Sequence, residues 1–277
     1  MKSFKLALGH EIPVFGIGSW RMGEQRACFD KEVGAIRCAI DLGITLIDTA
    51  EMYGEGGAEK VIAKAIQGRR DGLFLISKFY PHNAGYANVM RACERSLRRL
   101  NCDYLDMYLY HWPGNEPLSD TFAALHSLLE SGRIRGFGVS NFDLDDLQAI
   151  PPADQNRLGC NQIFYNLKHR EVEWTVADWC QQKAVPLMAY SPLDQAGSLL
   201  QSSVLANVAI RHEATAAQVA LAWLLHQPNT VVIPKSGSEA RISENLAAID
   251  MQLSRQDLAE LDRAFPGPQR PVRLGMR

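Results

Sequence analysis

The sequence predicts a (β/α)8 barrel, an α/β fold of the TIM-barrel type, built as one domain over residues 1–277. Predicted strands and helices alternate at fairly even intervals, which indicates parallel βαβ units. Eight such units follow one another from Phe15 onward, without a proline- or glycine-rich linker or a change of composition between them. An open doubly wound sheet is the competing architecture, but eight units in one stretch fit a closed barrel better.

Each predicted element is an apolar run with a recognisable end. Residues 4–13 form two short segments around Gly9 and His10, which predicts an N-terminal β-hairpin. Gly43 and Gly68 end two of the helical patterns, and Thr215 is a helix N-cap. Strands are expected at residues 14–20, 46–48, 73–78, 104–112, 134–141, 160–165, 185–192 and 231–236. Helices are expected at residues 33–42, 58–66, 87–100, 120–129, 144–149, 172–182, 205–211, 215–225, 239–249 and 255–265, before a short C-terminal tail.

Composition excludes several classes of protein. The net charge of −2 and the pI of about 6.4 provide no basic field for nucleic acid or an anionic membrane. The six cysteines form no Cys-x-x-Cys pair, so we expect free thiols rather than disulfides or a zinc site. No signal peptide opens the chain and no apolar run of membrane-spanning length occurs. These features favour a soluble, cytoplasmic protein.

Polar residues fall where the predicted strands end. Active sites of (β/α)8 barrels lie at the carboxyl ends of the strands, so these side chains are expected to meet at one rim. A single serine at a strand end is usually a helix cap, and a single histidine is usually a satisfied side chain. Polar residues at the ends of most strands, all at the same rim, indicate a site. The residues are Asp48, Lys78, His111, Ser140, Asn141, Tyr190, Ser191, Lys235 and Ser236, with Gln162 nearer the middle of its strand.

The first three strand ends, together with Tyr53, carry the groups of a proton-transfer centre. An ammonium about 4 Å from a phenol, at an effective dielectric constant of about 20, stabilises the phenolate by about 4 kcal/mol. We therefore expect Lys78 to lower the pKa of Tyr53 by roughly three units, towards neutral pH. Asp48 is expected to pair with Lys78, and His111 to donate a hydrogen bond to a substrate oxygen.

Two other chemistries compete for the same residues. A metal site is disfavoured, because no His-x-x-x-His spacing and no carboxylate cluster accompanies His111. A Schiff base on Lys78, as in barrel aldolases, is the more serious alternative. It leaves Tyr53 unexplained, together with the anion-binding pattern of residues 233–245.

Residues 233–245 have the composition of an anion site. Lys235, Ser236 and Gly237 end a strand, and Arg241 lies in the first turn of the next helix, whose N-terminus attracts negative charge. A glycine-rich dinucleotide loop is not expected elsewhere. The pair Gly16-x-Gly18 lacks a third glycine three positions on and opens no obvious helix.

These motifs, in this order, resemble those of the aldo-keto reductases over nearly the whole chain. The matching stretches are Gly16–Trp20, Leu46–Gly54, Ser77–Lys78, His111–Pro113, Gly138–Phe142, Asn161–Gln162, Ala189–Leu193 and Ile233–Asn245. Within the family, the chain looks most like bacterial members that reduce small aldehydes and dicarbonyls such as methylglyoxal.

The resemblance implies a reductase that transfers hydride from NADPH to a carbonyl carbon. It implies a catalytic tetrad of Asp48, Tyr53, Lys78 and His111, with Tyr53 as general acid. Two basic residues near the adenosine 2′-phosphate favour NADPH over NADH. The implied contacts of NADPH are Gly18, Ser19, Trp20, Asp48, Ser140, Asn141, Gln162, Tyr190, Ser191, Pro192, Leu193, Ile233, Lys235, Ser236, Gly237, Arg241, Glu244 and Asn245.

The implied substrate pocket is lined by Trp20, Tyr53, Tyr80, His111 and Trp112. Because the connection after His111 and the tail after Phe265 are both short, we expect a shallow, open pocket for small carbonyls. A reductase of keto-sugar acids and an NADPH-binding regulatory module with little turnover are alternatives. We expect a monomer with no metal.

Overall fold

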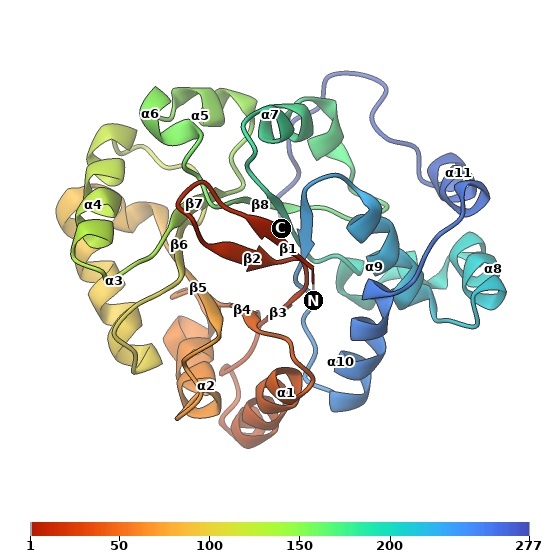
Figure 1. Ribbon diagram of the computed structural model, residues 1–277, viewed down its shortest axis with the longest axis horizontal. Helices are drawn as coiled ribbons and strands as arrows, with labels where there is room; N and C mark the ends of the chain where they lie inside the picture. Colours follow the sequence, from red (N-terminus) through yellow and green to blue (C-terminus); the bar gives the residue numbers. More distant parts are fainter. Residues whose placement is uncertain (1, 277) are drawn as a thin grey trace.

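The computed structural model describes residues 2–276 and forms the expected (β/α)8 barrel (Figure 1). Eight parallel strands make one sheet in the order β10-β9-β8-β7-β6-β5-β4-β3. Isolated bridges from Phe15 to Val232 and from Gly18 to Lys235 bring the two ends of this sheet together. The strands are β3 (Gly16–Gly18), β4 (Leu46–Asp48), β5 (Phe74–Phe79), β6 (Met107–Tyr110), β7 (Phe137–Ser140), β8 (Asn161–Phe164), β9 (Leu187–Tyr190) and β10 (Thr230–Val232).

The N-terminal hairpin closes one end of the barrel. Its strands β1 (Ser3–Lys5) and β2 (Glu11–Pro13) pair antiparallel, as the sequence predicts. Leu6 and Ile12 are buried in the same apolar cluster as Leu46 and Phe74, the first residues of β4 and β5. The hairpin therefore covers the amino-terminal end of the strands, and Figure 1 shows it lying across the ring. The carboxyl ends are left for a site.

The helices surround the strands in the order that the sequence predicts. They are α1 (Phe29–Asp41), α2 (Gly57–Ala65), α3 (Tyr86–Leu100), α4 (Leu118–Glu130), α5 (Leu144–Ala149), α6 (Pro152–Gln155), α7 (Val176–Gln182), α8 (Ser203–Arg211), α9 (Ala216–His226), α10 (Glu239–Leu246) and α11 (Arg255–Ala264). Thr215 caps α9 in a capping box with Gln218, as expected. The short helix α6 was not predicted. Helix α7 begins later than predicted because a 3-10 turn and the non-helical Thr175 precede it.

Alternation along the strands decides which side chains face the barrel interior. Ile76 of β5 belongs to the interior cluster, whereas its neighbour Leu75 packs beneath the helices. Two positions after Ile76 comes Lys78, which is therefore on the interior side as well. Leu46 and Leu109 stand in the same relation to Asp48 and His111. The three polar residues continue apolar interior rows at the open end of the barrel.

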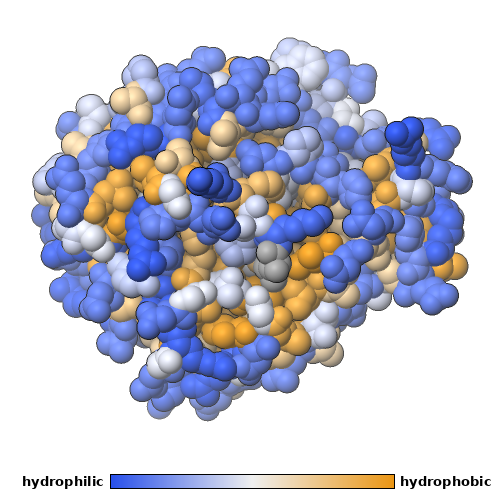
Figure 2. All heavy atoms as spheres, viewed as in Figure 1, coloured by the Kyte–Doolittle hydropathy of each residue, from blue (hydrophilic) through white to orange (hydrophobic). Residues whose placement is uncertain are grey.

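The surface on the hairpin side is mainly hydrophilic at its periphery (Figure 2), and the cysteines form no disulfide among the described residues. Figure 2, viewed from the hairpin side, shows a mainly hydrophilic periphery around a central area where hydrophobic residues reach the surface. Among the described residues, no helix is both long and apolar enough to span a bilayer. All six cysteines are free, as predicted.

Candidate active site

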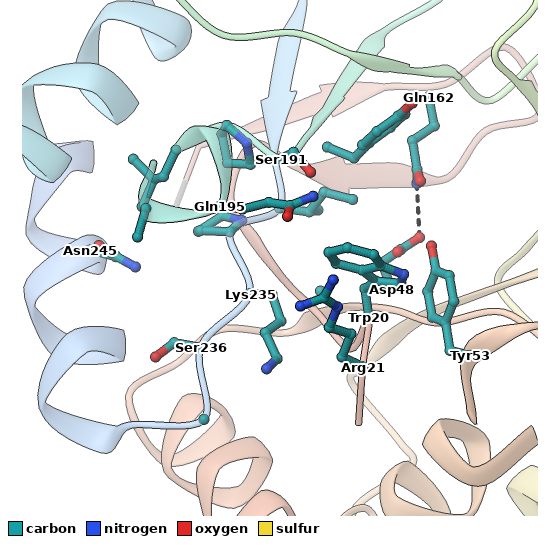
Figure 3. A pocket seen from close by; sticks show the side chains of 18 of the residues that line it. Trp20, Arg21, Asp48, Tyr53, Gln162, Ser191, Gln195, Lys235, Ser236 and Asn245 are labelled. Atoms are coloured by element: carbon teal, nitrogen blue, oxygen red, sulfur yellow. Dashed lines mark hydrogen bonds between the residues drawn. The ribbon is translucent and has the colours of Figure 1, made fainter. Parts of the chain in front are cut away.

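A cavity of about 880 Å³ opens at the carboxyl ends of the strands. This volume suits a large organic ligand rather than a single ion or water. Most of the residues predicted for a site line it: Gly18, Trp20, Asp48, Tyr53, His111, Trp112, Ser140, Asn141, Gln162, Tyr190, Ser191, Pro192, Leu193, Ile233, Lys235, Ser236, Gly237, Arg241, Glu244 and Asn245. Figure 3 shows that they come from opposite sides of the barrel mouth, with Asp48 and Tyr53 at one end and Asn245 at the other.

Lys78 lies directly behind this cavity and connects two of its residues. Its ammonium donates hydrogen bonds to Asp48 Oδ2 at 2.8 Å, to the Thr49 carbonyl at 2.8 Å and to the Tyr53 hydroxyl at 3.2 Å. The side chain is fully buried, so these acceptors replace water for all three N–H groups. Asp48 Oδ1 accepts a further bond from Gln162 Nε2 at 2.8 Å, drawn as a dashed line in Figure 3.

The pKa of Tyr53 differs from the sequence-based expectation. It is raised well above 10, first because burial disfavours the phenolate and second because the charge of Asp48 repels it. The expectation of a lowered pKa counted the attraction of Lys78 and omitted both of these effects. Burial also lowers the pKa of Lys78, against the opposing charge of Asp48. At neutral pH Tyr53 is therefore a protonated phenol that holds a proton to give.

His111 is a neutral imidazole in this structure. Its pKa is lowered well below 6.5, mainly by burial and further by the charge of Lys78. Its Nδ1 is buried without a hydrogen-bond partner in residues 2–276, so a proton there would be an unsatisfied donor. The tautomer protonated at Nε2 avoids this cost and leaves an N–H for the cavity, beside the Tyr53 ring at a centroid distance of 5.8 Å.

A flat aromatic wall forms the next part of the cavity. The Tyr190 ring stacks on Phe164 at 5.6 Å between centroids, with an interplanar angle of 17°, and Phe164 stacks in turn on His169. The Tyr190 hydroxyl donates to Asn141 Oδ1 at 2.9 Å, while Asn141 Nδ2 donates to the His111 carbonyl and to Ser140 Oγ. One face of Tyr190 is thus supported from behind, and the ring presents its other face to the cavity.

The far end of the cavity is cationic. Lys31, Lys235 and Arg241 line it, and none of them has an ion pair among the described residues. Arg21 lies nearer the Asp48 end, with its guanidinium carbon 4.4 Å from the centre of the Trp20 ring. In Figure 3, Lys235 and Ser236 lie between Arg21 and Asn245. Ser238 occupies the N-cap position of α10, but its side chain makes no cap hydrogen bond. A purely structural role as a helix cap therefore does not account for this serine. Unpaired cations beside a helix N-terminus suit an anionic ligand.

Sequence reasoning missed several lining residues. They are Arg21, Lys31, Gln195, Ala196, Leu200, Ala217, Pro234, Ser238 and Met276. The signal for Arg21 was its position directly after Trp20. No signal in the sequence marked Lys31, because it lies on the exposed side of α1 and reaches the cavity only through the packing of α1 against α10.

Besides Lys78, which lies behind the cavity, two residues predicted for the site lie outside the set that lines it. Tyr80 stacks on His82 and contacts the edge of Trp112, so it supports the wall from behind. Ser19 is fully buried, and its hydroxyl has no partner among the described residues. Both follow a strand end, but their side chains turn away from the open space.

The tail also departs from the expectation of an open mouth. The Leu274 N–H donates to Asp143 Oδ2 at 3.1 Å, and Met276 reaches the cavity lining. The short tail after α11 therefore crosses the barrel mouth and supplies an apolar side chain to the site.

The site has no metal-binding constellation. No group of three or more histidine, cysteine, aspartate or glutamate side chains with ligand geometry occurs in residues 2–276. Proton transfer between a phenol, an ammonium and an imidazole is the chemistry that the geometry supports.

Comparison with known proteins agrees with this site. Residues 14–265 match the aldo/keto reductase family. The chain is 46% identical over 270 residues to methylglyoxal reductase YeaE of Escherichia coli, covering 96% of this chain and 95% of the relative. It is 36% identical over 258 residues to glyoxal reductase of Bacillus subtilis, covering 93% and 91% of the two chains.

Solved structures show the same fold throughout the chain. The crystal structure of an aldo-keto reductase from Klebsiella pneumoniae in complex with NADPH superposes with a TM-score of 0.96 at 46% identity. It covers 100% of this chain and 99% of that one. A second Klebsiella pneumoniae structure, in complex with NADP and acetate, has the same TM-score at 47% identity and the same coverage. The chain therefore belongs to the aldo/keto reductase family.

Proposed function

We propose that this protein is an NADPH-dependent reductase of small aldehydes and ketones, with methylglyoxal and related dicarbonyls as its substrate class. The observation that carries the proposal is the hydrogen-bonded chain from Asp48 through Lys78 to Tyr53, beside the neutral His111. The names of the similar Escherichia coli and Bacillus subtilis enzymes support the substrate class. The NADPH and NADP complexes of the Klebsiella pneumoniae structures support the cofactor.

The residues present fit NADPH. The supported ring of Tyr190 offers a stacking surface for the nicotinamide, and Ser140, Asn141 and Gln162 border it. Lys235, Ser236 and Arg241 suit the 2′-phosphate, and Lys31 adds a cation that the sequence did not suggest. Glu244 and Asn245 lie beyond them for the adenine, with Glu244 accepting a bond from Thr215 Oγ1 at 2.8 Å.

When bound, NADPH supplies a hydride for the carbonyl carbon. The protein then has to orient the carbonyl and supply a proton to its oxygen. His111 donates Nε2–H to that oxygen and holds it beside Tyr53. Tyr53 gives its proton to the oxygen, and the Lys78 ammonium stabilises the resulting phenolate across a distance of 3.2 Å. Asp48 keeps Lys78 charged and in place.

The walls near Tyr53 favour small substrates. Trp20, Met52, Trp112 and Met276 surround the space above the proton donor with apolar surface. Such a wall accepts a methyl group or a short chain next to the carbonyl. The bulk of Met276 and the two indoles disfavours wide, rigid ketones.

Loss of the proton donor tests the proposal. We expect Tyr53→Phe to reduce kcat for methylglyoxal by about 10²–10⁴-fold, because general acid catalysis contributes about that much. The loss of NADPH absorbance measures the rate, and NADPH binding, measured by fluorescence, should remain. Tyr86→Phe is the control, since Tyr86 is an exposed tyrosine of α3 that bonds only Ser127. A Tyr53→Phe enzyme as fast as wild type overturns the proposal.

The lyase alternative has a separate readout. Trapping of Lys78 by borohydride in the presence of substrate, with turnover that needs no NADPH, favours Schiff-base chemistry. Tight NADPH binding with negligible reduction across a panel of aldehydes, dicarbonyls and keto-sugar acids favours a regulatory module.

We also propose that the enzyme acts as a monomer in the cytoplasm. Six free cysteines suit a reducing compartment. Light scattering coupled to size-exclusion chromatography tests the oligomeric state, and a mass near twice the chain's 30.8 kDa argues against a monomer.

A further inference from the structure

The loop that carries Tyr53 has an unusual backbone. Between β4 and α2, Gly54, Glu55 and Gly56 all have positive φ angles, of 56°, 52° and 84°. Such a run is costly for a residue with a side chain, as at Glu55, and persists only where the surroundings hold it. The position of the Tyr53 hydroxyl therefore depends on what fixes this loop.

A buried carboxylate stands at each end of the loop. Glu51 lies two residues before Tyr53 and is 7% exposed, and Glu59 lies six residues after it and is fully buried. A buried carboxylate is stable only with hydrogen-bonded or charged partners. Neither residue lines the cavity in the described part of the chain, so these partners are not the substrate.

Arg99 of α3 joins the two carboxylates. Its Nε donates to Glu59 Oε2, and its Nη2 lies 3.9 Å from Glu51 Oε2. Arg95, one turn earlier, approaches the same Glu51 oxygen at 3.6 Å. The stem of Arg99 packs on the loop itself, since a Cβ at Gly56 would lie 2.5 Å from Arg99 Cδ. The Arg99 guanidinium thus contacts Glu51 before the strained turn and Glu59 after it, and the Arg99 stem packs against the turn itself.

The remaining carboxylate oxygens tie the loop to β5. Glu59 Oε1 accepts a bond from Ser77 Oγ at 2.7 Å. Glu51 Oε1 accepts from the Tyr80 N–H at 2.9 Å and from Asn83 Nδ2 at 2.7 Å. Ser77 and Tyr80 flank the strand end that carries Lys78. The two carboxylates therefore fix the loop of the proton donor against the strand of its ammonium partner.

We propose that Arg99 is a positioning residue for the reaction, which sets the distance between the Tyr53 hydroxyl and Lys78 Nζ through Glu51 and Glu59. This inference rests on the proposed function of Tyr53. Arg99 touches neither substrate nor cofactor; it fixes the relative position of two elements whose side chains meet at 3.2 Å. A displacement of about 1 Å at such a contact costs about 10²-fold in rate.

The test compares Arg99→Leu with Arg98→Leu. Arg98 is the exposed neighbour on the same helix, so both variants lose one positive charge from α3. We expect Arg99→Leu to lower kcat by about 10–100-fold when the rate is measured well below the melting temperature of the variant. The dissociation constant of NADPH, measured by fluorescence, should stay within about twofold of wild type, because no cavity-lining residue is changed. Arg98→Leu should match wild type in both measurements.

Two conservative variants separate positioning from simple structural support and carry the test if Arg99→Leu does not fold. Arg99→Lys keeps the charge, but its single ammonium cannot contact both carboxylates as the planar guanidinium does. Its kcat should therefore lie between those of Arg99→Leu and wild type. Glu51→Gln keeps the shape and the Tyr80 bond but loses the charge, and it should lower kcat without weakening NADPH binding. Folded Arg99 and Glu51 variants with wild-type kcat and only a lower melting temperature overturn the inference. Because Tyr53→Phe is measured alongside, that result leaves the proposed function intact.

Discussion

Gln162 Nε2 lies 2.8 Å from Asp48 Oδ1, although 114 residues separate the two in the sequence. Lys78 Nζ lies 2.8 Å from both carboxylate oxygens of Asp48, and the Gln162 bond adds a second donor to Oδ1 and joins β8 to β4 across the barrel. Asp48 is thus held from two sides before any ligand binds. The bond fixes the carboxylate that keeps Lys78 charged.

Removal of this amide should affect both stability and rate. We expect Gln162→Leu to lower the free energy of unfolding by about 1–3 kcal/mol, because a buried charged acceptor loses its donor. We also expect kcat to fall by roughly tenfold as Asp48 becomes free to turn. Urea unfolding and steady-state kinetics measure the two effects. The control is Gln155→Leu, which removes an amide that bonds only backbone carbonyls near α6.

Asp48→Asn should be among the most destabilising single changes in the barrel. It leaves the fully buried Lys78 without its counter-charge, a loss of about 3–5 kcal/mol. Asp41→Asn breaks an ion pair with Arg69 whose side chains are 58% and 44% exposed, and such pairs contribute at most about 1 kcal/mol. Thermal unfolding of both variants measures the contrast. Equal losses of stability in the two variants would contradict the expected contribution of the buried Asp48–Lys78 pair.

His111 should make stability depend on pH on the acid side of neutrality. Its pKa in the folded chain is lowered, mainly by burial, so the unfolded chain takes up a proton near pH 6.5 that the folded chain refuses. Stability therefore falls as the pH drops below about 6.5, by up to about 1.4 kcal/mol per unit. His111→Gln should flatten this slope of the unfolding free energy, and His10→Gln should leave it unchanged. An identical slope in His111→Gln contradicts the assignment.

Asp257 should also make stability depend on pH, here because, although burial acts to raise its pKa, hydrogen bonds lower it. Burial acts to raise its pKa, but hydrogen bonds from Ser254, His212 and Arg211 outweigh burial, and the folded pKa is lowered from 3.8. The contribution is therefore complete above about pH 4 and is lost as the pH falls further. We expect Asp257→Asn to reduce stability at pH 7 and to shrink the difference from wild type in acid. Asp178→Asn, on the exposed side of α7, is the control for acid unfolding.

Lys31 should contribute to the preference for NADPH. Charge reversal in Lys31→Glu is expected to weaken NADPH binding about 5–10-fold, because an exposed charge contact contributes about 1 kcal/mol. NADH, which lacks the 2′-phosphate, should lose less. Fluorescence titration at two salt concentrations measures both constants, and the NADPH effect should shrink at high salt. Lys60→Glu on α2 reverses an exposed charge outside the cavity and is the control.

The sequence was informative wherever function coincides with strand ends. Asp48, Lys78 and His111 could be found because each ends an apolar run, and the structure places each of them two positions after an interior residue, Leu46, Ile76 or Leu109. The two residues of each pair are near neighbours in the chain, so local patterns suffice for this kind of prediction.

Long-range packing was beyond the reach of these patterns. Lys31 and Met276 enter the cavity only because α1 packs on α10 and the tail crosses the barrel mouth. The predicted direction of the Tyr53 pKa shift was wrong for a similar reason. The charge of Lys78 was visible in the sequence, but the burial that raises the pKa was not. The role of Arg99 also depends on two contacts that span 40 and 48 residues.

The division of labour between strands and loops has a consequence for how such an enzyme changes over time. The proposed proton-transfer groups stand on β4, on β5, just after β6 and on one loop held by Arg99, whereas Gln195 and Met276 reach the cavity from a 3-10 turn after β9 and from the tail. We expect replacement of those outer segments to alter which carbonyl fits and to leave the proposed proton transfer unchanged. Directed evolution towards new substrates should therefore accumulate changes in residues 194–201 and 266–276 first.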